Sequence, residues 1–284
     1  MKPIRREFDH PVKPRVTPEP FVIPDYMDDD LFDKTGEQWY FEVIEQTEYG
    51  VDPFNEGLTP DAYWAEGWNL SYYQADRSNA CGHDDALHRM FPTRYRLADF
   101  NLSRSFRRVL KNNADLECVV RPFRPTPAKD ELDQIHCYSR FRETKAPLST
   151  IYTRLRYRAA PINELTVFHP TRGMIAFTLI EIGENASYAV RTAWNPDERK
   201  RGLGTFTFLK TVEYARSLGF EHHYVGPTLL ADPAFSYKLR FPACELYDWD
   251  ANDWVASESE RAKAMFAAPF PRRRWDPETE DWAV

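Results

Sequence analysis

Between residues 164 and 195 the hydrophobic positions form three β-rich runs separated by short polar turns. The turn sequences are Pro-Thr-Arg-Gly at 170–173 and Glu-Asn at 184–185, and both are typical of tight connections. Strands that are joined by such short turns run antiparallel. The pattern therefore predicts a three-stranded antiparallel meander, with strands at 164–169, 174–183 and 186–195.

A long helix is expected after the meander. The apolar positions predict a helix from about Thr205 to Leu218, and Gly219 stands where a C-cap glycine belongs. A strand, a short helix and a last strand follow, at 222–226, 233–240 and 244–249. This part of the chain is thus expected to fold as an α+β domain, with a mixed, mostly antiparallel sheet and flanking helices.

The first half of the chain predicts a smaller α+β lobe. Thr59 and Pro60 open a short helix, and Thr126 caps a longer one. Strands are expected at 37–49, 93–100 and 117–123, and a further helix is expected at 101–116. Residues 1–36 hold six prolines and one glycine, which indicates an extended arm. The expected organisation is an arm at 1–36, a lobe at 37–145, a second domain at 146–265 and a tail at 266–284.

Length and composition indicate a globular protein. The chain has 284 residues, of which 42% are hydrophobic and 15% aromatic, enough for a sizeable core. No apolar run approaches the roughly 18 to 20 residues that cross a bilayer. The first twenty residues lack the apolar core of a secretory signal, so a cytoplasmic protein is expected.

The four cysteines predict neither a disulfide framework nor a zinc knuckle. Cys81, Cys118, Cys137 and Cys244 lie far apart, and none forms a C-x-x-C pair. The stretch CGHDDALH brings Cys81, His83 and His88 close together in sequence, so it could supply two or three metal ligands. Because no second cluster completes a four-coordinate site, a polar loop without metal is expected.

Charge is divided unevenly along the chain. The net charge is −7, yet residues 89–111 carry seven basic residues and one acidic residue. On the helix expected to begin near Ser103, four cations share one face: Arg104, Arg107, Arg108 and Lys111. Such a face favours contact with a phosphate backbone, because like charges at this spacing repel unless an anion neutralises them. A cationic face that is merely solvated is the alternative.

A glycine turn precedes the long helix. Arg199, Gly202 and Gly204 form an R-x-x-G-x-G pattern at the end of a strand and the start of a helix. Free N–H groups and the helix dipole favour an anion there, and glycine lets phosphate oxygens approach the main chain. Together with the meander, this order resembles the core of GNAT acyltransferases, in which the turn takes the pyrophosphate of acetyl-coenzyme A. A tight connection that binds nothing is the alternative.

Three segments resemble the arginyl/leucyl-tRNA–protein transferase family, which moves an amino acid from its tRNA onto the N-terminus of an acceptor protein. FNLSRSFRRVLKNNADL at 100–116 is similar to the family's S-R-S-x-R-R-V-L segment. The stretch 195–226 resembles its R-S-L-G-T turn, helix and Y-x-G strand, and SYKLRFPACEL at 236–246 resembles its Y-K-x-x-F element. The likeness covers about two thirds of the chain.

The resemblance implies where the site lies and what it binds. No cofactor is implied besides aminoacyl-tRNA as co-substrate, and the acceptor is a protein N-terminus or a small amine. Tyr237 and Lys238 are the implied catalytic residues, and His222 and His223 are possible bases, of which only one can face a cleft. Tyr224, Gly226 and Phe241 are expected to line the cleft. The residues expected to bind tRNA phosphates are Arg104, Arg107, Arg108, Lys111, Arg199, Gly202, Leu203, Gly204 and Thr205.

The chain also departs from the family pattern. The family has cysteines just before the S-R-S segment, and the corresponding stretch 88–100 has none. Gly202 replaces the family's serine, which makes the turn more like that of a coenzyme A enzyme. Two other readings therefore stay open beside the aminoacyl-tRNA-dependent transferase. One is an acetyl-coenzyme A-dependent acyltransferase, and the other is a non-catalytic relative that binds RNA or protein.

Overall fold

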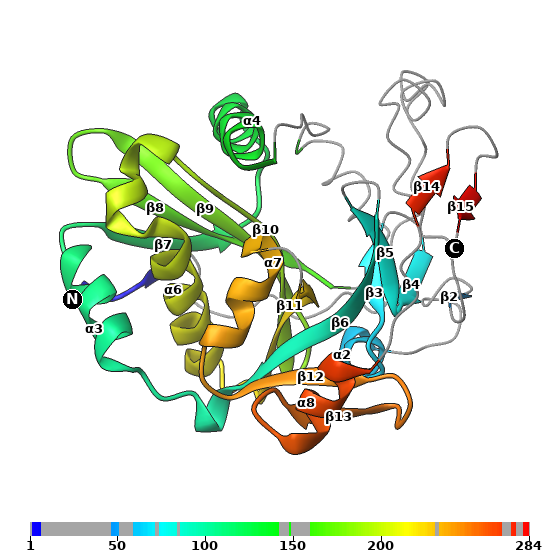
Figure 1. Cartoon of the computed structure of the whole chain (residues 1–284). Coiled ribbons are helices and arrows are strands. Elements are labelled where there is room, and N and C mark those ends of the chain that lie inside the picture. The colour runs from blue at the N-terminus through cyan, green and yellow to red at the C-terminus, as the bar shows by residue number, and fades with distance from the viewer. Residues whose placement is uncertain are drawn as a thin grey trace.

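Figure 1 shows a computed structural model of the whole chain. It describes residues 2–6, 47–50, 59–71, 74–83, 86–141, 148, 160–230, 233–268, 274–276 and 281–283. Most of the expected arm, residues 7–36, lies outside the described residues, and so does the strand expected at 37–49 except for its end, in β2 (Thr47–Gly50). No helix in the described ranges combines the length and the apolar character that crossing a membrane requires.

A large mixed sheet forms the centre of the molecule. Neighbouring pairs in it are antiparallel, except that β1 runs parallel to β7 and β10 runs parallel to β11. Its main path, in spatial order, is β1 (Arg5–Arg6), β7 (Glu117–Pro122), β8 (Ile162–His169), β9 (Gly173–Ile182), β10 (Ala186–Trp194), β11 (His222–Leu229), β6 (Ala86–Arg96), β12 (Cys244–Asp248) and β13 (Asp253–Ala256).

Shorter strands lie beside this path. β5 (Ala80–His83) pairs with β6, and so does β14 (Arg274–Asp276), which pairs in turn with β15 (Asp281–Ala283). A separate three-stranded sheet has the order β2, β4 (Gln74–Ser78) and β3 (Asn69–Ser71). The strands β6 and β7, which lie in the expected lobe at 37–145, pair with strands of the expected domain at 146–265. One sheet therefore runs through both predicted parts, and the boundaries between them stay a prediction.

The expected meander, helix and strand are present in the expected order. β8, β9 and β10 are antiparallel neighbours, α6 (Leu203–Ser217) follows, and β11 returns beside β10. The two parallel strands pair only over Ala186–Tyr188 and His222–Tyr224. Beyond these residues no pairing joins them, so β10 and β11 separate toward their carboxyl ends. This arrangement confirms the predicted α+β fold with a GNAT-like order of strands.

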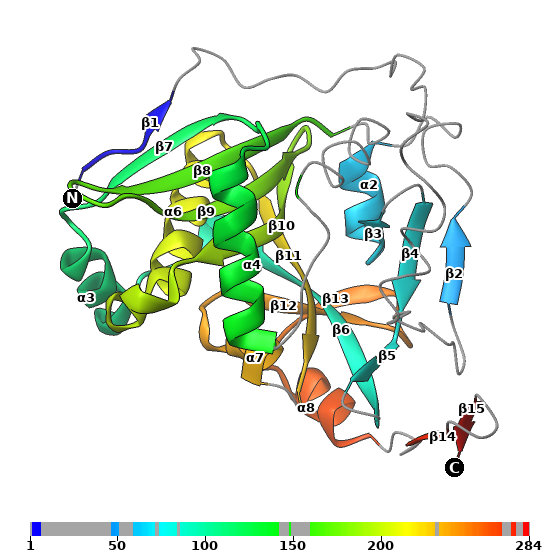
Figure 2. The same cartoon turned by 90° about the horizontal axis from the view of Figure 1, so that it is seen from above.

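Helices cover both faces of the sheet, as Figures 1 and 2 show. α6 and α3 (Arg104–Asn112) pack on one face, where they share a core with β7, β8 and β9. α4 (Pro127–Phe141) crosses the other face, and α2 (Pro60–Ala65) lies on that face near β10 and β11. The expected caps are confirmed. Thr59 and Thr126 each accept a hydrogen bond from the backbone three residues later, and Ser103, which was not predicted as a cap, does the same for α3.

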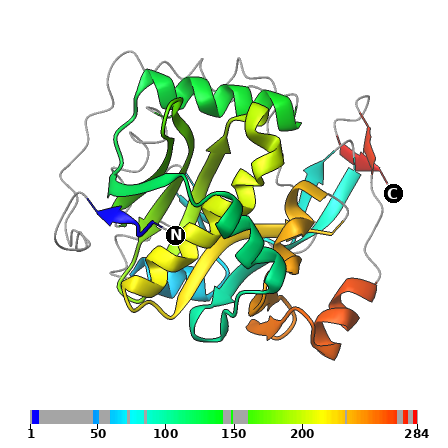
Figure 3. The ribbon, with the colours of Figure 1, turned by 90° about the vertical axis from the view of Figure 1, so that its left-hand side faces the viewer.

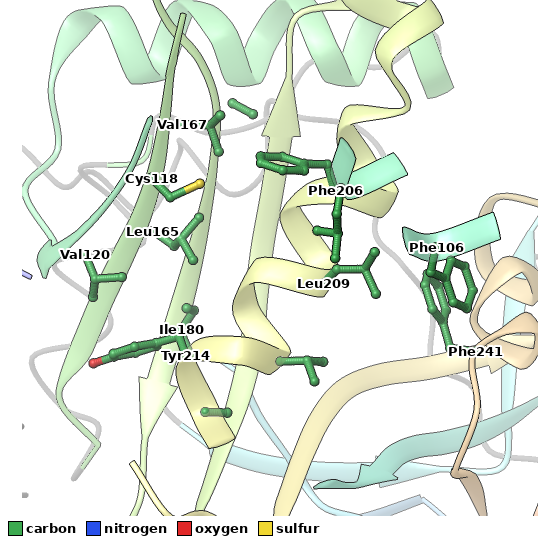
Figure 4. Packing of buried hydrophobic residues seen from close by; sticks show 14 of the residues in the cluster. Phe106, Cys118, Val120, Leu165, Val167, Ile180, Phe206, Leu209, Tyr214 and Phe241 are labelled. Atoms are coloured by element: carbon green, nitrogen blue, oxygen red, sulfur yellow. The ribbon is translucent and has the colours of Figure 1, made fainter. Parts of the chain in front are cut away.

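The main core lies between the sheet and α6. Figure 4 shows Phe206 and Leu209 of α6 near Leu165 and Val167 of β8, and all four are buried. At roughly 25 cal/mol per Å², burial of such side chains is the main source of stability. The core continues to Phe241, which stacks on Phe106 of α3 with ring centroids 4.8 Å apart.

Three short helices complete the second half of the chain. α7 (Pro233–Ser236) runs directly into η3 (Tyr237–Arg240), where the sequence predicted one short helix at 233–240. α8 (Glu260–Ala267) follows β13 and packs on Phe91 and Leu246 through Met265. The sequence did not predict this helix.

Candidate functional site

The turn before α6 has a defined backbone conformation. It begins with η2 (Pro196–Arg201), where the Asn195 side chain accepts a hydrogen bond from the Asp197 N–H. Gly202 ends η2 with φ of +66°, in the left-handed region that favours glycine. A Cβ on Gly204 would lie 3.2 Å from the indole nitrogen of Trp194. Both glycines are thus explained by the fold itself, whether or not the turn holds a ligand.

The first amides of α6 are available to a ligand. Among the described residues, the N–H groups of Leu203, Gly204 and Thr205 have no hydrogen-bond partner, whereas the Phe206 N–H bonds the Gly202 carbonyl. Leu203 is buried as a whole residue, whereas Gly204 and Thr205 are partly exposed, so the amides of these two residues are the accessible ones. A helix N-terminus carries about half a positive charge, which favours an anion.

Arg240 adds a full charge to this end of α6. Its Nη2 donates to the Thr205 hydroxyl at 2.5 Å, and the side chain is exposed. The guanidinium carbon lies 5.7 Å from the ring centroid of Tyr237 and 5.2 Å from that of Phe241. Arg240 was not predicted from the sequence, because only the fold brings η3 to the start of α6.

The basic face of α3 points outward. Phe106 and Leu110 are buried against the core on the opposite side of the helix. Within the described part of the chain, none of the outward cations pairs with a carboxylate, and the one hydrogen bond they make is from Arg107 to the Leu102 carbonyl. The exposed cations are the four predicted ones, Arg104, Arg107, Arg108 and Lys111.

α3 is fixed to the glycine turn at one end and to the end of α6 at the other. The Asn113 side-chain amide donates to the carbonyls of Val109 and Arg201, both at 2.9 Å. Just before α3, the Phe100 carbonyl accepts a hydrogen bond from Arg216 in the last turn of α6. The two helices therefore run in opposite directions, and Figure 3 shows the teal α3 in front of the yellow α6. The C-terminal end of the basic helix lies at the glycine turn.

The cations of η2 belong to the same region. Arg201 donates to Asp115 at 3.0 Å and to Glu198, so its charge is neutralised. Arg199 and Lys200 are exposed. The structure therefore places the C-terminal end of the predicted cationic helix beside the turn that carries Arg199, whereas Arg104 lies at the other end of α3, toward the end of α6.

Lys238 is a buried residue of η3. It is 6% exposed, and its ammonium group donates to the carbonyl of Pro227 in β11. Burial lowers the pKa of Lys238 to about 7. A lysine with this pKa is partly neutral at physiological pH and can accept a proton.

Tyr237, the neighbouring residue, is 38% exposed. Desolvation raises the pKa of its phenol, and the nearby Arg140 and Arg240 partly oppose this effect. The phenol thus stays protonated at neutral pH. Arg140 belongs to the last turn of α4. Because its charge acts on the Tyr237 phenol, this end of α4 lies near η3.

The other predicted cleft residues lie on different faces of the sheet. Tyr224 contacts Trp64 of α2, with ring centroids 5.8 Å apart. Phe241 is 3% exposed and packs on the α6 side. Gly226, with φ of +71°, lies at an irregularity in the pairing of β11 with β6. The structure does not bring these three residues into one group.

The two histidines also separate. His223 is fully buried on the α6 side and hydrogen-bonds Ser187 at 2.8 Å, and burial lowers its pKa to about 3. His222 points to the opposite face, as Tyr224 does, and burial followed by the charge of Arg94 lowers its pKa. Neither histidine lies at the glycine turn.

The structure tests the metal hypothesis only in part. The register of β5 and β6 places Cys81 opposite His88, and the side chains of Cys81 and His83 lie outside the described ones. Among described residues, no group of three His, Cys, Asp or Glu is arranged to hold a metal ion.

Comparison with known proteins identifies the family. A family model described as "Arginine-tRNA-protein transferase, C terminus" matches residues 125–248. An aspartate/glutamate leucyltransferase of Stenotrophomonas maltophilia (strain K279a) is 30% identical over 182 residues, which cover 59% of this chain and 69% of that protein. An aspartate/glutamate leucyltransferase of Pseudomonas fluorescens (strain Pf0-1) is 27% identical over 159 residues, which cover 55% of this chain and 67% of that protein. The chain thus spans about two thirds of the length of these relatives.

Solved structures give weaker likenesses. L-PGS from Bacillus licheniformis has 16% sequence identity and a TM-score of 0.40, covering 53% of this chain and 50% of that one. FemX has 12% sequence identity and a TM-score of 0.39, and the likeness covers 52% of this chain and 55% of the FemX chain. The order of strands described above supports the fold independently of them.

The sequence relatives confirm the predicted class of enzyme, an aminoacyl-tRNA-dependent transferase. The chain belongs to the arginyl/leucyl-tRNA–protein transferase family.

Proposed function

We propose that the chain transfers an amino acid of the arginine or leucine class from aminoacyl-tRNA to the α-amine of an acceptor. The relatives carry the name aspartate/glutamate leucyltransferase. By similarity to them, the donor is leucyl-tRNA and the acceptor is a polypeptide that begins with Asp or Glu. A small amine is the alternative acceptor.

One structural relationship carries the proposal, namely the junction of the basic helix α3 with the glycine turn. Asn113 connects the two at 2.9 Å, and four cations continue from the turn along the exposed face of α3, where none of them pairs with a carboxylate of a described residue. A row of cations about 10 Å long, at 1.5 Å per residue over the seven steps from Arg104 to Lys111, matches a polyphosphate backbone better than a single pyrophosphate. The tRNA acceptor arm is proposed to lie along α3, with its 3′ end at the turn.

The chemistry then needs mainly positioning. The aminoacyl ester is already activated, and the attacking α-amine has an ordinary pKa near 8. The amine nitrogen forms a bond to the ester carbonyl carbon and loses one proton, the bond from that carbon to the ribose oxygen breaks, and the ribose oxygen takes up one proton, so that the two proton transfers balance. Lys238, with its pKa of about 7, accepts the proton that the amine loses. The open N–H groups at the start of α6 donate hydrogen bonds to the phosphate next to the 3′ end of the tRNA, and Arg240 neutralises the charge of that phosphate. No cofactor is required.

Coenzyme A-dependent acyl transfer is the second candidate, because the open amides at the start of α6 also suit a pyrophosphate. The test runs both donors in parallel. The protein is incubated with a pool of radiolabelled aminoacyl-tRNAs and peptides bearing every N-terminal residue, and separately with labelled acetyl-coenzyme A.

Label on the α-amine of peptides from the tRNA pool supports the proposal, and the identity of the labelled peptide names the acceptor. Label from acetyl-coenzyme A alone overturns the proposal. Binding of tRNA without any transfer would instead support a non-catalytic relative.

A further inference from the structure

Tyr237 exposes an aromatic ring beside the proposed site. Four large hydrophobic side chains are exposed among the described residues, namely Ile135, Tyr138, Leu230 and Tyr237. Tyr237 is the one that lies within η3, directly next to Lys238. Its ring meets Phe241 edge-on, with centroids 6.4 Å apart, so the buried Phe241 supports it from below.

Two arginines from different elements flank this ring. Arg240 lies 5.7 Å from the centroid and reaches the Thr205 hydroxyl on the first turn of α6. Arg140 comes from the last turn of α4 and is close enough to affect the phenol electrostatically. Both arginines are exposed, and within the described ranges neither makes an ion pair with a carboxylate.

An exposed ring with adjacent cations is the arrangement that binds the end of a single-stranded nucleic acid. Bases that are not paired stack on aromatic side chains and on guanidinium planes, and nearby arginines neutralise the phosphates. We propose that Tyr237 is the stacking platform for the terminal base of the aminoacyl-tRNA, with Arg240 binding the adjoining ribose phosphate. This inference rests on the proposed function and assigns Tyr237 to binding rather than to proton transfer.

The phenol hydroxyl is poorly suited to the alternative role in catalysis. Desolvation raises its pKa, which makes it a weaker acid at neutral pH. The aromatic ring, by contrast, has the supporting and flanking groups that stacking requires. An acceptor polypeptide that docks on this ring through its acidic first residue is the alternative occupant, and the acceptor KM in the test below distinguishes it from the RNA.

The test separates the ring from the hydroxyl and the RNA from the acceptor. Wild type is compared with Tyr237→Phe, Tyr237→Leu and Arg240→Gln, and Tyr138→Leu serves as control for loss of another exposed tyrosine. Each protein receives two donors that carry the same aminoacyl ester on the same RNA stem. One donor ends in a normal nucleotide, and the other ends in a ribose without its base. KM and kcat are measured for donor and acceptor, and thermal melting reports folding.

If the ring stacks on the terminal base, the KM and kcat of Tyr237→Phe should stay within about two-fold of the wild-type values. Tyr237→Leu should raise the KM for the normal donor about ten-fold or more, in line with the typical value of one stacked base. The baseless donor should bind wild type and Tyr237→Leu equally weakly. Arg240→Gln should raise the KM for both donors, and Tyr138→Leu for neither.

Three outcomes would overturn the inference while leaving the proposed function intact. The first is a loss of kcat in Tyr237→Phe, and the second is a rise in the acceptor KM alone in Tyr237→Leu. The third is a rise in the donor KM of Tyr138→Leu as large as that of Tyr237→Leu. If wild type transfers nothing from either donor, the proposed function fails first.

Discussion

The side-chain amide of Asn113 lies 2.9 Å from the carbonyl oxygen of Arg201, and this hydrogen bond joins the end of the basic helix to the turn before α6. The same amide group donates to the Val109 carbonyl within α3. Asn113 is buried, so the two bonds hold α3 and the turn in one fixed relation. The phosphate-binding groups of both elements are thereby oriented together.

Replacing Asn113 by alanine should loosen this relation. We expect Asn113→Ala to lower the free energy of unfolding by about 1 to 2 kcal/mol, because a buried donor is lost and a carbonyl is left without its partner. The KM for aminoacyl-tRNA should rise several-fold while kcat changes little. Urea unfolding and steady-state kinetics measure the two effects. Asn101→Ala is the matched control, since among the described residues the Asn101 amide bonds only the nearby Asp99 carbonyl at the surface.

The two glycines of the turn should respond differently to substitution. Gly202 has a left-handed φ of +66° and free space around it, so Gly202→Asn should cost less than about 1 kcal/mol. Gly204→Ala places a methyl group 3.2 Å from the Trp194 indole nitrogen. The indole should shift, and with it the ring of His136, which lies 4.9 Å away. A higher KM for aminoacyl-tRNA is expected in Gly204→Ala alone. KM values that stay at the wild-type level in both variants would show that the turn does not touch the donor.

Lys238 should make stability depend on pH in a defined window. Its pKa falls from 10.5 in the unfolded chain to about 7 in the folded one. Between these values the unfolded state binds more protons, so stability should rise as the pH rises from 7 toward 10, and should not change below 7 on this account. Lys238→Met removes this dependence.

At pH 7, Lys238→Met should be more stable than wild type by on the order of 2 to 4 kcal/mol, because the cost of burying the ammonium outweighs the hydrogen bond lost to Pro227. Transfer activity should fall at the same time. Urea unfolding at pH 6 to 10 measures the difference, which should shrink as the pH rises. A constant difference across this range would contradict the lowered pKa.

Local signals in the sequence predicted most of the elements around the site. Ser103 and Thr126 cap helices because their hydroxyls accept from the chain three residues later, a purely local interaction. The four cations of α3 follow from helical spacing alone. The glycine at 202 marks the turn because its φ is positive. Such features need no knowledge of distant contacts.

Features that depend on packing between distant segments were not predicted. Arg240 reaches Thr205 across 35 residues, and Asn113 reaches Arg201 across 88. Gly204 faces Trp194 rather than open space, which no local pattern indicates. Phe241 was expected to line a cleft, and the structure buries it against Phe106, because the core continues past the end of α6.

The central claim is that the exposed cations of α3 bind the phosphates of tRNA. Its most direct test is the affinity for tRNA as a function of salt, in wild type and in a protein with Arg104, Arg107 and Arg108 all replaced by alanine. Each lost phosphate contact lowers the slope of log affinity against log salt by about one. The control replaces Lys263 and Arg5, whose cations pair with Glu260 and Glu117. We predict a slope reduced by about two to three and much weaker binding in the triple variant only. Unchanged affinity and slope in that variant would contradict the account.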